Sequence, residues 1–255
     1  MTRTVRDDLG ASVELPDGPV QRIVSLVPSL TEAIAATGRQ ALVGVTDWCT
    51  HPADLRVQRV RGTKNPDRAA IEALAPQLVI CVQEENRELD VQRLRAAGVP
   101  VWVAVIESVE QSLSAMRRLF DEVLGWEVPP WLLEAEQVWS APAPGAPTKV
   151  AVAIWRDPWM VVGSRNFTTD LLGRAGLVNV FGQHEERYPH VEAQQIDGAG
   201  ADVVLLPDEP YVFTAQDGPE AFTSTPSRLV TGRLLTWYGP ALLEARAHLE
   251  AVRQQ

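Results

Sequence analysis

Cysteine, histidine and tyrosine are scarce in this sequence, whose 255 residues include 2 Cys, 4 His and 3 Tyr. Cys49 and Cys81 show no CxxC spacing and have no further cysteines with which to build a disulfide framework, so we expect both to be reduced thiols. A chain of this length can bury one large core, or two of ordinary size, without cross-links. The sequence therefore predicts a globular protein that is held together by packing.

Long apolar runs are also missing. The longest, residues 78–82 and 101–106, have five and six residues, whereas a membrane-spanning helix needs about 20. The first 30 residues contain neither a lipidation cysteine nor the run of about seven apolar residues that marks a secretory signal. We therefore expect a cytoplasmic protein without membrane insertion; an incomplete N-terminus would instead place it in the periplasm or outside the cell.

Positive charge is in short supply, since 23 Lys and Arg stand against 33 Asp and Glu, a formal net charge of −10. A nucleic-acid partner is not expected, because phosphate binding needs a basic face. The sequence also lacks the GxGxxG, Walker A, GxSxG and HExxH signatures. The missing signatures leave an enzyme without a visible warrant in the sequence, but they do not exclude one.

Short apolar runs alternate with helical segments along the first half of the chain. After the run at residues 22–27, Ser29 and Glu32 have the spacing of a capping box, and Gly38 suits a helix end. Further strand-like and helical segments follow at residues 42–45, 67–74, 78–82, 89–97 and 101–105. Nearly continuous apolar strands that alternate with helices predict a parallel sheet covered on both faces.

The alternation stops and then restarts. Helical spacing at residues 108–124 and 131–139 is followed by a proline-rich connector at 141–147. Strands are then expected at 149–155, 202–206 and, as an extended segment, 229–237, with helices at 167–175, 191–196 and 240–252. The predicted fold class is α/β, with two Rossmann-like lobes at residues 1–107 and 149–255 that are joined by a helical segment at 108–148.

Aromatic and polar residues gather just after the predicted strands, where ligands bind on parallel sheets. Aromatic rings with a few fixed polar groups suit a large, flat, partly apolar ligand, because a ring gives much contact area and loses little side-chain entropy. Any single aromatic residue, such as Trp155 or Trp237, has an equally plain interpretation as part of the core. The candidate ligand contacts are Pro28, Ser29, Trp48, His51, Glu84, Glu85, Arg87, Trp155, Arg156, Trp159, Tyr188, Glu209, Trp237 and Tyr238.

Some of these residues allow other interpretations. Glu84 and Glu85 form either an acid–base pair or a solvated loop that Arg87 compensates. Cys49 and His51 offer a soft ligand and an imidazole to a metal, so His51 is a candidate metal ligand. A second set of metal-ligating types occurs at residues 184–190 without a familiar spacing, and a solvated loop explains each set as well.

Residues 22–32 (RIVSLVPSLTE) and 43–45 (VGV) resemble the start of the helical-backbone, or class III, solute-binding proteins of the Fe/B12 type. The resemblance continues through residues 70–79 (AIEALAPQLV) and 94–101 (LRAAGVPV), and the loops at 84–87 and 155–159 look most like a signal-less subgroup of metal receptors. It covers nearly the whole chain. This family includes cobalamin, haem and ferric-siderophore receptors of ABC importers.

The resemblance implies two α/β lobes, bridged by a long helix, that hold a metal chelate in the cleft between them. Cobalamin or a related corrinoid is the first expectation, with haem or a ferric siderophore as alternatives, and the loops of Trp48, Trp155, Tyr188 and Trp237 correspond to the family's aromatic contacts. We therefore expect a non-catalytic binding protein. An enzyme acting on a bound tetrapyrrole, with Glu84, Glu85 or His51 as acid or base, is an alternative.

A possible ABC permease is the other partner that the resemblance implies. Import receptors of this family dock through one acidic residue in each lobe, which pairs with permease arginines. The aligned positions here hold Ala69 and Gln194, which lack that charge, and a shifted alignment would use Asp67, Glu72 or Glu192. The missing carboxylates, taken with the lack of an export signal and of a lipidation cysteine near the start of the sequence, favour a receptor fold that is detached from import. A true import receptor whose export signal is missing is the alternative.

Overall fold

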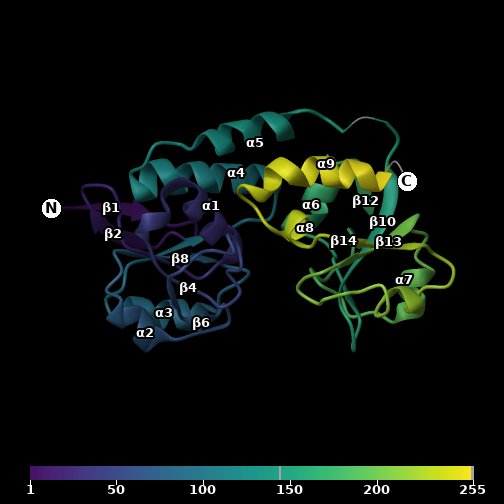
Figure 1. Ribbon diagram of the computed structural model, residues 1–255, viewed down its shortest axis with the longest axis horizontal. Coiled ribbons are helices and arrows are strands. Elements are labelled where there is room, and N and C mark those ends of the chain that lie inside the picture. Colours follow the sequence, from purple (N-terminus) through teal and green to yellow (C-terminus); the bar gives the residue numbers. More distant parts are fainter. Residues whose placement is uncertain (144, 254–255) are drawn as a thin grey trace. The chain divides into compact units, whose positions relative to one another are not determined.

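The computed structural model describes residues 1–143 and 145–253 and divides the chain into two compact units (Figure 1). Unit 1 comprises Met1–Ile106, Glu110–Glu136 and Tyr238–Pro240, and unit 2 comprises Glu107–Val109, Gln137–Trp237 and Ala241–Gln255. The predicted connecting segment at 108–148 is thus shared between the units, and the lobe boundaries drawn from the sequence stay a prediction. Pro144 of the predicted connector and the last two residues of the predicted second lobe lie outside the described residues.

Unit 1 is built on a parallel sheet in the order β5-β4-β3-β8-β9. The strands pair in parallel throughout, and every residue of the central ones is buried because helices cover both faces of the sheet. Their bounds are Ile23–Ser25 for β3, Leu42–Val45 for β4, Gln58–Arg59 for β5, Leu78–Val82 for β8 and Val101–Ala104 for β9. The parallel sheet that the sequence predicts is therefore confirmed.

Helices α2 and α3 cover one face of this sheet, and α1 and α4 cover the other (Figure 1). The core on the α2 and α3 side includes Ile71, Cys81 and Leu94. The helices are α1 (Pro28–Gly38), α2 (Arg68–Ala73), α3 (Glu88–Ala96), α4 (Val109–Arg118), a π-helical continuation η2 (Leu119–Leu124) and α5 (Pro130–Ser140); η1 (Arg39–Ala41) is a short 3-10 turn. Two hairpins complete the fold, β1 (Thr2–Arg6) with β2 (Ser12–Pro16) and β6 (Arg61–Gly62) with β7 (Asn65–Pro66).

Unit 2 contains a second sheet in the order β11-β10-β13-β14, with β12 also paired to β10. All its pairs are parallel except that of β10 with β11. The strands are β10 (Thr148–Trp155), β11 (Met160–Val161), β12 (Leu177–Asn179), β13 (Val203–Pro207) and β14 (Ser227–Val230). The helices are α6 (Phe167–Arg174), α7 (Ala193–Asp197), the 3-10 turn η3 (Pro219–Ala221), α8 (Arg233–Thr236) and α9 (Ala241–Arg253).

Two local predictions are wrong. Helix α1 begins at Pro28 and its N-cap is Val27 without a side-chain cap, so Ser29 lies inside the first turn rather than capping it. Proline has the φ angle of a first helical residue and starts the helix two residues earlier than predicted. The segment predicted as extended at 229–237 is strand only to Val230 and then forms α8, because an apolar run of this length fits a strand and a short helix equally.

No helix within the described ranges is both long and apolar enough to cross a membrane.

Candidate functional site

The loop that follows β4 presents Trp48 to solvent. Trp48 is 65% exposed, although hydrogen bonds from Arg59 hold the loop that carries it. Arg59 donates two hydrogen bonds from Nη1, to the carbonyl oxygens of Thr46 and Cys49, each at 2.9 Å. Trp48 therefore presents its ring to solvent on a loop that Arg59 holds in place, and its role as a ligand contact stays a prediction.

Cys49 lies beneath this loop and is fully buried. Its Sγ atom lies 3.0 Å from the hydroxyl oxygen of Thr31 and 3.1 Å from that of Thr46, and burial raises the pKa of the thiol. His51 is exposed, with Nδ1 at 3.1 Å from the Thr50 hydroxyl. Within residues 1–143 and 145–253, no three or more His, Cys, Asp or Glu side chains gather as a metal ion would require. A metal role for His51 stays a prediction.

The loop that follows β8 is held by Asn86, which the sequence interpretation did not single out. The Asn86 amide donates to the carbonyl oxygens of Leu26 (3.2 Å) and Thr63 (3.1 Å) and accepts from the Val82 amide at 2.9 Å. Lys64, on the turn between β6 and β7, donates to the carbonyl oxygen of Glu84. These bonds join the ends of β3 and β8 to the hairpin, so Glu84 and Glu85 lie on a supported loop.

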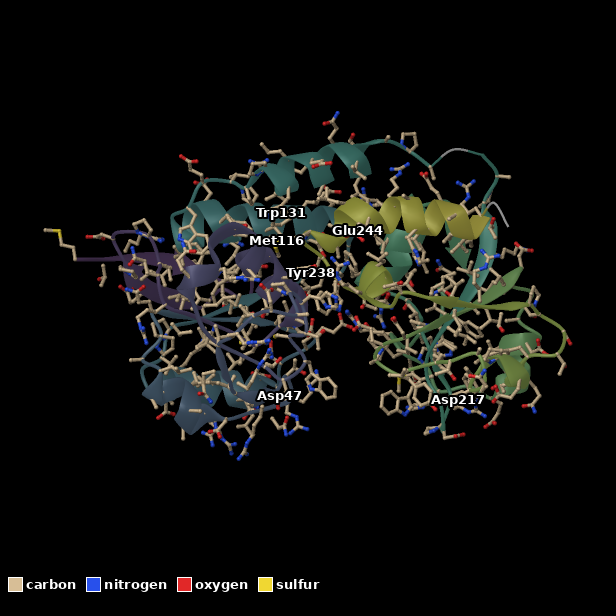
Figure 2. The ribbon with its side chains drawn as sticks, in the orientation of Figure 1. Asp47, Met116, Trp131, Asp217, Tyr238 and Glu244 are labelled. Atoms are coloured by element: carbon tan, nitrogen blue, oxygen red, sulfur yellow. The ribbon has the colours of Figure 1, made fainter. Side chains whose placement is uncertain are left out.

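Tyr238 packs in unit 1 against this loop (Figure 2). Its side chain is 4% exposed, and its hydroxyl donates to Oε1 of Glu85 at 3.2 Å. Burial raises the pKa of Tyr238 well above its ordinary value, and the negative charge of Glu85 raises it further, while Ser29 lowers it. The phenol therefore stays protonated at neutral pH and acts as a hydrogen-bond donor that orients Glu85. Ser29 is buried beside it, and Pro28 is half-buried.

In unit 2, Trp155 ends β10 and is 44% exposed. Its ring meets the edge of the Tyr211 ring, with the centroids 5.7 Å apart, and the neighbouring Val212 is exposed as well. Trp159, four residues later, is instead only 9% exposed, and it stacks on Phe213 at 5.8 Å within the core. Trp155 therefore reaches solvent, whereas Trp159 packs in the core of unit 2; the roles of both as ligand contacts stay predictions.

Arg156 is surrounded by carboxylates. Its guanidinium bonds to Asp217 and to Glu220, lies 3.7 Å from the Asp157 carboxylate, and sits 5.5 Å above the Trp159 ring. The hydrogen bond to Glu220 is the main reason that the pKa of Arg156 is raised. The Tyr211 hydroxyl donates to Asp217 at 2.6 Å, which ties the aromatic pair to the same group. The Arg156 guanidinium thus pairs with carboxylates of unit 2, so it is not a binding site for an anionic ligand.

The remaining predicted contacts differ in exposure. Trp237 is buried in unit 2, while Tyr188 and Glu209 are half-buried. Glu209 packs over Gly232, where an added Cβ would lie 2.5 Å from the Glu209 Cγ atom. Arg87 is exposed and precedes the first turn of α3. The roles of these residues as ligand contacts stay predictions.

Comparison with known proteins places this architecture. No family model matches the chain. A vitamin B12-binding protein of Vibrio parahaemolyticus is 22% identical and the match covers 73% of this chain and 70% of the relative; one of Salmonella choleraesuis is 26% identical, with 69% and 68% covered. The solved periplasmic vitamin B12 binding protein BtuF of Vibrio cholerae superposes with a TM-score of 0.73 at 18% identity, covering 93% and 99% of the two chains. The periplasmic heme-binding protein RhuT of Roseiflexus superposes with a TM-score of 0.76 at 20% identity, covering 92% and 100%.

The chain has the fold of the class III solute-binding proteins. The resemblance that the sequence motifs indicated is thereby confirmed, and so is the α/β fold class. The relatives are named as binding proteins, and the two solved structures are described as periplasmic.

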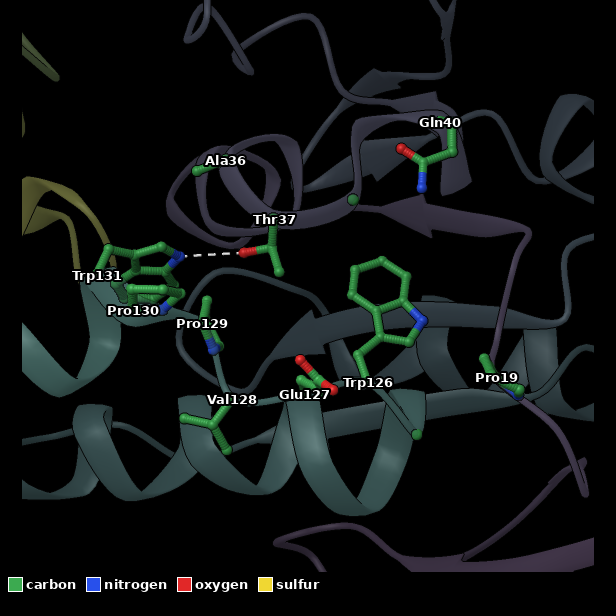
Figure 3. A pocket seen from close by; sticks show the side chains of 12 residues that line it. Pro19, Ala36, Thr37, Gln40, Trp126, Glu127, Val128, Pro129, Pro130 and Trp131 are labelled. Carbon is green, nitrogen blue, oxygen red and sulfur yellow. Dashed lines mark hydrogen bonds between the residues drawn. The ribbon is translucent and has the colours of Figure 1, made fainter.

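One hollow in unit 1 lies away from the strand ends. It has a volume of about 520 Å³ and is formed in unit 1 between the end of α1 and the start of α5 (Figure 3). Trp131 lines it and donates from Nε1 to the Thr37 hydroxyl at 3.0 Å. None of the predicted ligand contacts lines this hollow.

Proposed function

We propose that this protein is a non-catalytic binding protein for a metal chelate of the corrinoid, haem or ferric-siderophore type. The ligand contacts lie on the strand-end loops, with Trp48 as the candidate aromatic contact in unit 1 and Trp155 as the candidate in unit 2. Cobalamin or a related corrinoid is the leading candidate. No reaction is assigned to the protein, and the Glu84–Glu85 pair contributes hydrogen bonds rather than acid–base chemistry.

One observation carries the proposal: each unit exposes a tryptophan at the carboxyl end of a parallel sheet, in a fold shared with B12- and heme-binding proteins. Ligands on parallel sheets bind at the carboxyl ends of the strands. Flat conjugated rings gain most from aromatic side chains that are already fixed in place, because little conformational entropy is lost on binding. Trp48 and Trp155 meet both conditions, since Arg59 fixes the first loop and Tyr211 supports the second ring.

The test is titration of the purified protein with cyanocobalamin, cobinamide, hemin and ferric siderophores, followed by tryptophan quenching and visible spectra. We expect saturable binding of at least one chelate. Trp48→Ala and Trp155→Ala should each weaken binding by about tenfold or more, since each removes a large aromatic contact. No saturable binding of any chelate at tens of micromolar would overturn the proposal.

A matched control separates contact from general damage. Leu133 is another exposed apolar side chain, on α5 of unit 1, and it belongs to none of the strand-end loops. Leu133→Ala should leave binding unchanged. If Leu133→Ala weakened binding as much as the tryptophan variants do, the strand-end loops would not be the binding surface.

A second candidate function is that of an import receptor, which the periplasmic description of the solved structures favours. An ABC permease would then be the partner, and the location would be periplasmic rather than cytoplasmic. Glu72 on α2 and Glu192 at the start of α7 are exposed and would supply the docking charges. Fractionation of the native host with an antibody to this protein separates the two locations: periplasmic recovery supports the receptor, and cytoplasmic recovery supports a storage or transfer role.

A further inference from the structure

The hollow between α1 and α5 of unit 1 is lined by two indole rings that are fixed in place. Trp126 donates from Nε1 to the carbonyl oxygen of Val20 at 3.1 Å, and Trp131 donates to the Thr37 hydroxyl at 3.0 Å (Figure 3). Both rings also pack against Phe120, with the ring centroids 6.1 and 5.8 Å away. Because each ring is held at its N–H group and at its face, little side-chain entropy would be lost when a ligand binds between them.

Few hydrogen-bond donors remain in this hollow. Both indole N–H groups are used, and the Thr37 hydroxyl donates to the carbonyl oxygen of Ala33 at 2.9 Å. Among the described residues that line the hollow, Gln40 is the only other one with a side-chain N–H group, and none is Lys, Arg or His. An anionic ligand would therefore find few partners there.

Negative charge is present at the hollow instead. Glu127 lines it, next to Trp126 in the sequence, and has no ion-pair partner among the residues that the structure describes. The last turn of α1 contributes Ala36, Thr37 and Gly38, and the carbonyl end of a helix carries a partial negative charge. A cation is therefore attracted by the carboxylate and the helix end, and the faces of indole rings attract cations as well.

Two arginines near the hollow do not reverse this charge. Arg39, which follows the end of α1, pairs with the Asp54 carboxylate through hydrogen bonds of 2.8 and 2.6 Å. Arg3 keeps its charge and binds carbonyl oxygens near the end of η2, but the exposed carboxylate of Asp121 in the same segment offsets it. Glu127 therefore leaves the hollow with a negative balance.

The other walls of the hollow are aliphatic, and they narrow the kind of cation that fits. Val128, Pro129 and Pro130 line it beside Ala36. A primary ammonium ion is strongly hydrated and carries three N–H donors, which these walls cannot satisfy. A methylated ammonium ion needs no acceptors, and aromatic rings recognise it through its methyl groups and its charge. The volume of about 520 Å³ is in the range of small-molecule sites.

We propose that this hollow is a second binding site of the protein, for a small organic cation whose ammonium group is methylated. Trp126 and Trp131 contact the methyl groups, and Glu127 balances the positive charge. The site lies wholly in unit 1 and uses none of the strand-end loops. It is therefore additional to the proposed chelate binding and does not depend on it.

The decisive experiment compares three small molecules by isothermal titration calorimetry, on the full chain without chelate and at constant salt. Choline carries both the methyl groups and the charge, ethanolamine carries the charge without the methyl groups, and dimethylbutanol carries the methyl groups without the charge. We expect saturable binding of choline that is about tenfold tighter or more than that of either analogue. No saturable binding of choline at tens of millimolar, or an analogue that binds as tightly, would overturn the proposal and leave the chelate proposal standing.

Variants then locate the cation. Glu127→Gln should weaken choline binding severalfold, because it removes the charge and keeps the shape. Glu72→Gln is the matched control and should change nothing, since Glu72 is an exposed carboxylate on α2, which covers the opposite face of the sheet from α1 (Figure 1). Trp131→Leu keeps an apolar side chain but removes the ring, so it should weaken choline binding about tenfold or more.

Two further measurements separate a lost contact from a damaged fold. Urea unfolding should give Glu127→Gln the same midpoint as the wild type, because Glu127 is exposed. Chelate affinity should be unchanged in Glu127→Gln and Trp131→Leu, because the strand-end loops are intact in both. Choline binding of wild-type strength in Glu127→Gln would overturn the role of the carboxylate, and the same result in Trp131→Leu would overturn that of the ring.

Discussion

At the scale of single residues, the two tryptophans that flank Arg156 have opposite surroundings. Trp155 ends β10 with 44% of its side chain exposed, whereas Trp159 is 9% exposed and contacts Phe213 and Phe222. The sequence places both tryptophans in one loop and does not show which of them is exposed. The alternation of inward and outward side chains holds only within a strand, so it makes no prediction for the residues beyond the strand end. Which of the two rings is exposed depends on which one the segment at residues 211–222 covers. That segment lies far from both tryptophans in the sequence.

The pair gives a matched prediction. Trp155→Ala should leave the melting temperature nearly unchanged and weaken chelate binding, because the ring contributes little to the core. Trp159→Ala should cost about 3–5 kcal/mol of unfolding free energy, since it opens a cavity in the core of unit 2. Denaturant unfolding measures the stability, and tryptophan quenching measures the affinity. A large loss of stability in Trp155→Ala with unchanged binding would contradict the assigned contact.

The candidate site could be predicted in part at this scale. The sequence correctly indicated that aromatic and acidic residues follow the strands, because strand ends can be read from where apolar runs stop. It gave no sign of the supporting bonds of Asn86, Arg59 and Lys64, since these join segments that are distant in sequence. The N-cap expected from Ser29 failed because Pro28 starts the helix first.

At the scale of elements, α7 is tied to the segment before β14 through Asp197. Its carboxylate accepts hydrogen bonds from the backbone amides of Thr223, Ser224 and Thr225, between 2.7 and 3.1 Å. These bonds, that of Thr223 most of all, lower the pKa of Asp197 to about 2. The group is therefore ionised when folded at pH values where an unfolded aspartate is already protonated.

The pH dependence follows from the sign of this shift. Because the folded pKa lies below the unfolded value of 3.8, Asp197 stabilises unit 2 fully above about pH 4, and this contribution is lost as the pH falls toward 2. Asp197→Asn should lower stability at pH 7, and the difference from wild type should shrink across that window. Unfolding by urea at several pH values measures it, with Glu185→Gln, an exposed loop carboxylate, as control. A difference that is independent of pH would contradict the role of the charge.

The end of α1 depends on a close approach that only glycine permits. A Cβ atom at Gly38 would lie 2.7 Å from two ring atoms of Trp126. Gly38→Ala should therefore destabilise the protein by about 1–3 kcal/mol through overpacking. Gly173→Ala, in α6, is the matched control: an added Cβ there meets nothing within 4 Å, so it should be neutral or stabilising. Combining Gly38→Ala with Trp126→Leu should recover stability if the clash is the cause, and a Gly38→Ala variant as stable as wild type would refute it.

At the scale of the whole molecule, the sequence predicted two parallel α/β sheets because apolar runs separated by helices have few other solutions. It could not predict that Tyr238–Pro240 returns to pack in unit 1, since no local pattern marks such a crossing. From the net charge of −10 it predicted only that a nucleic-acid partner is not expected. In the structure, several of the carboxylates cap helices or form ion pairs, among them Asp67 and Asp217.

Docking on a permease would need carboxylates at particular places, and the acidic residues nearest those places are unequal. Asp67 is committed to capping α2, where it accepts from the Ala70 amide at 3.1 Å, and it lies 3.5 Å from Arg61. Glu192 is exposed, but its side chain likewise caps its own helix, in a capping box with Gln195 at the start of α7. Glu72 is exposed on α2, while Ala69 and Gln194 occupy the aligned positions and cannot pair with arginine.

We therefore expect the ligand-loaded wild-type protein not to stimulate the ATPase activity of a reconstituted vitamin B12 importer. Ala69→Glu combined with Gln194→Glu should introduce stimulation, because it supplies the two missing charges, whereas Gln137→Glu, which adds charge elsewhere, should not. Stimulation by the wild type that disappears in Glu72→Gln and Glu192→Gln would instead establish those two carboxylates as the docking pair. The protein would then be a working import receptor rather than a fold separated from import.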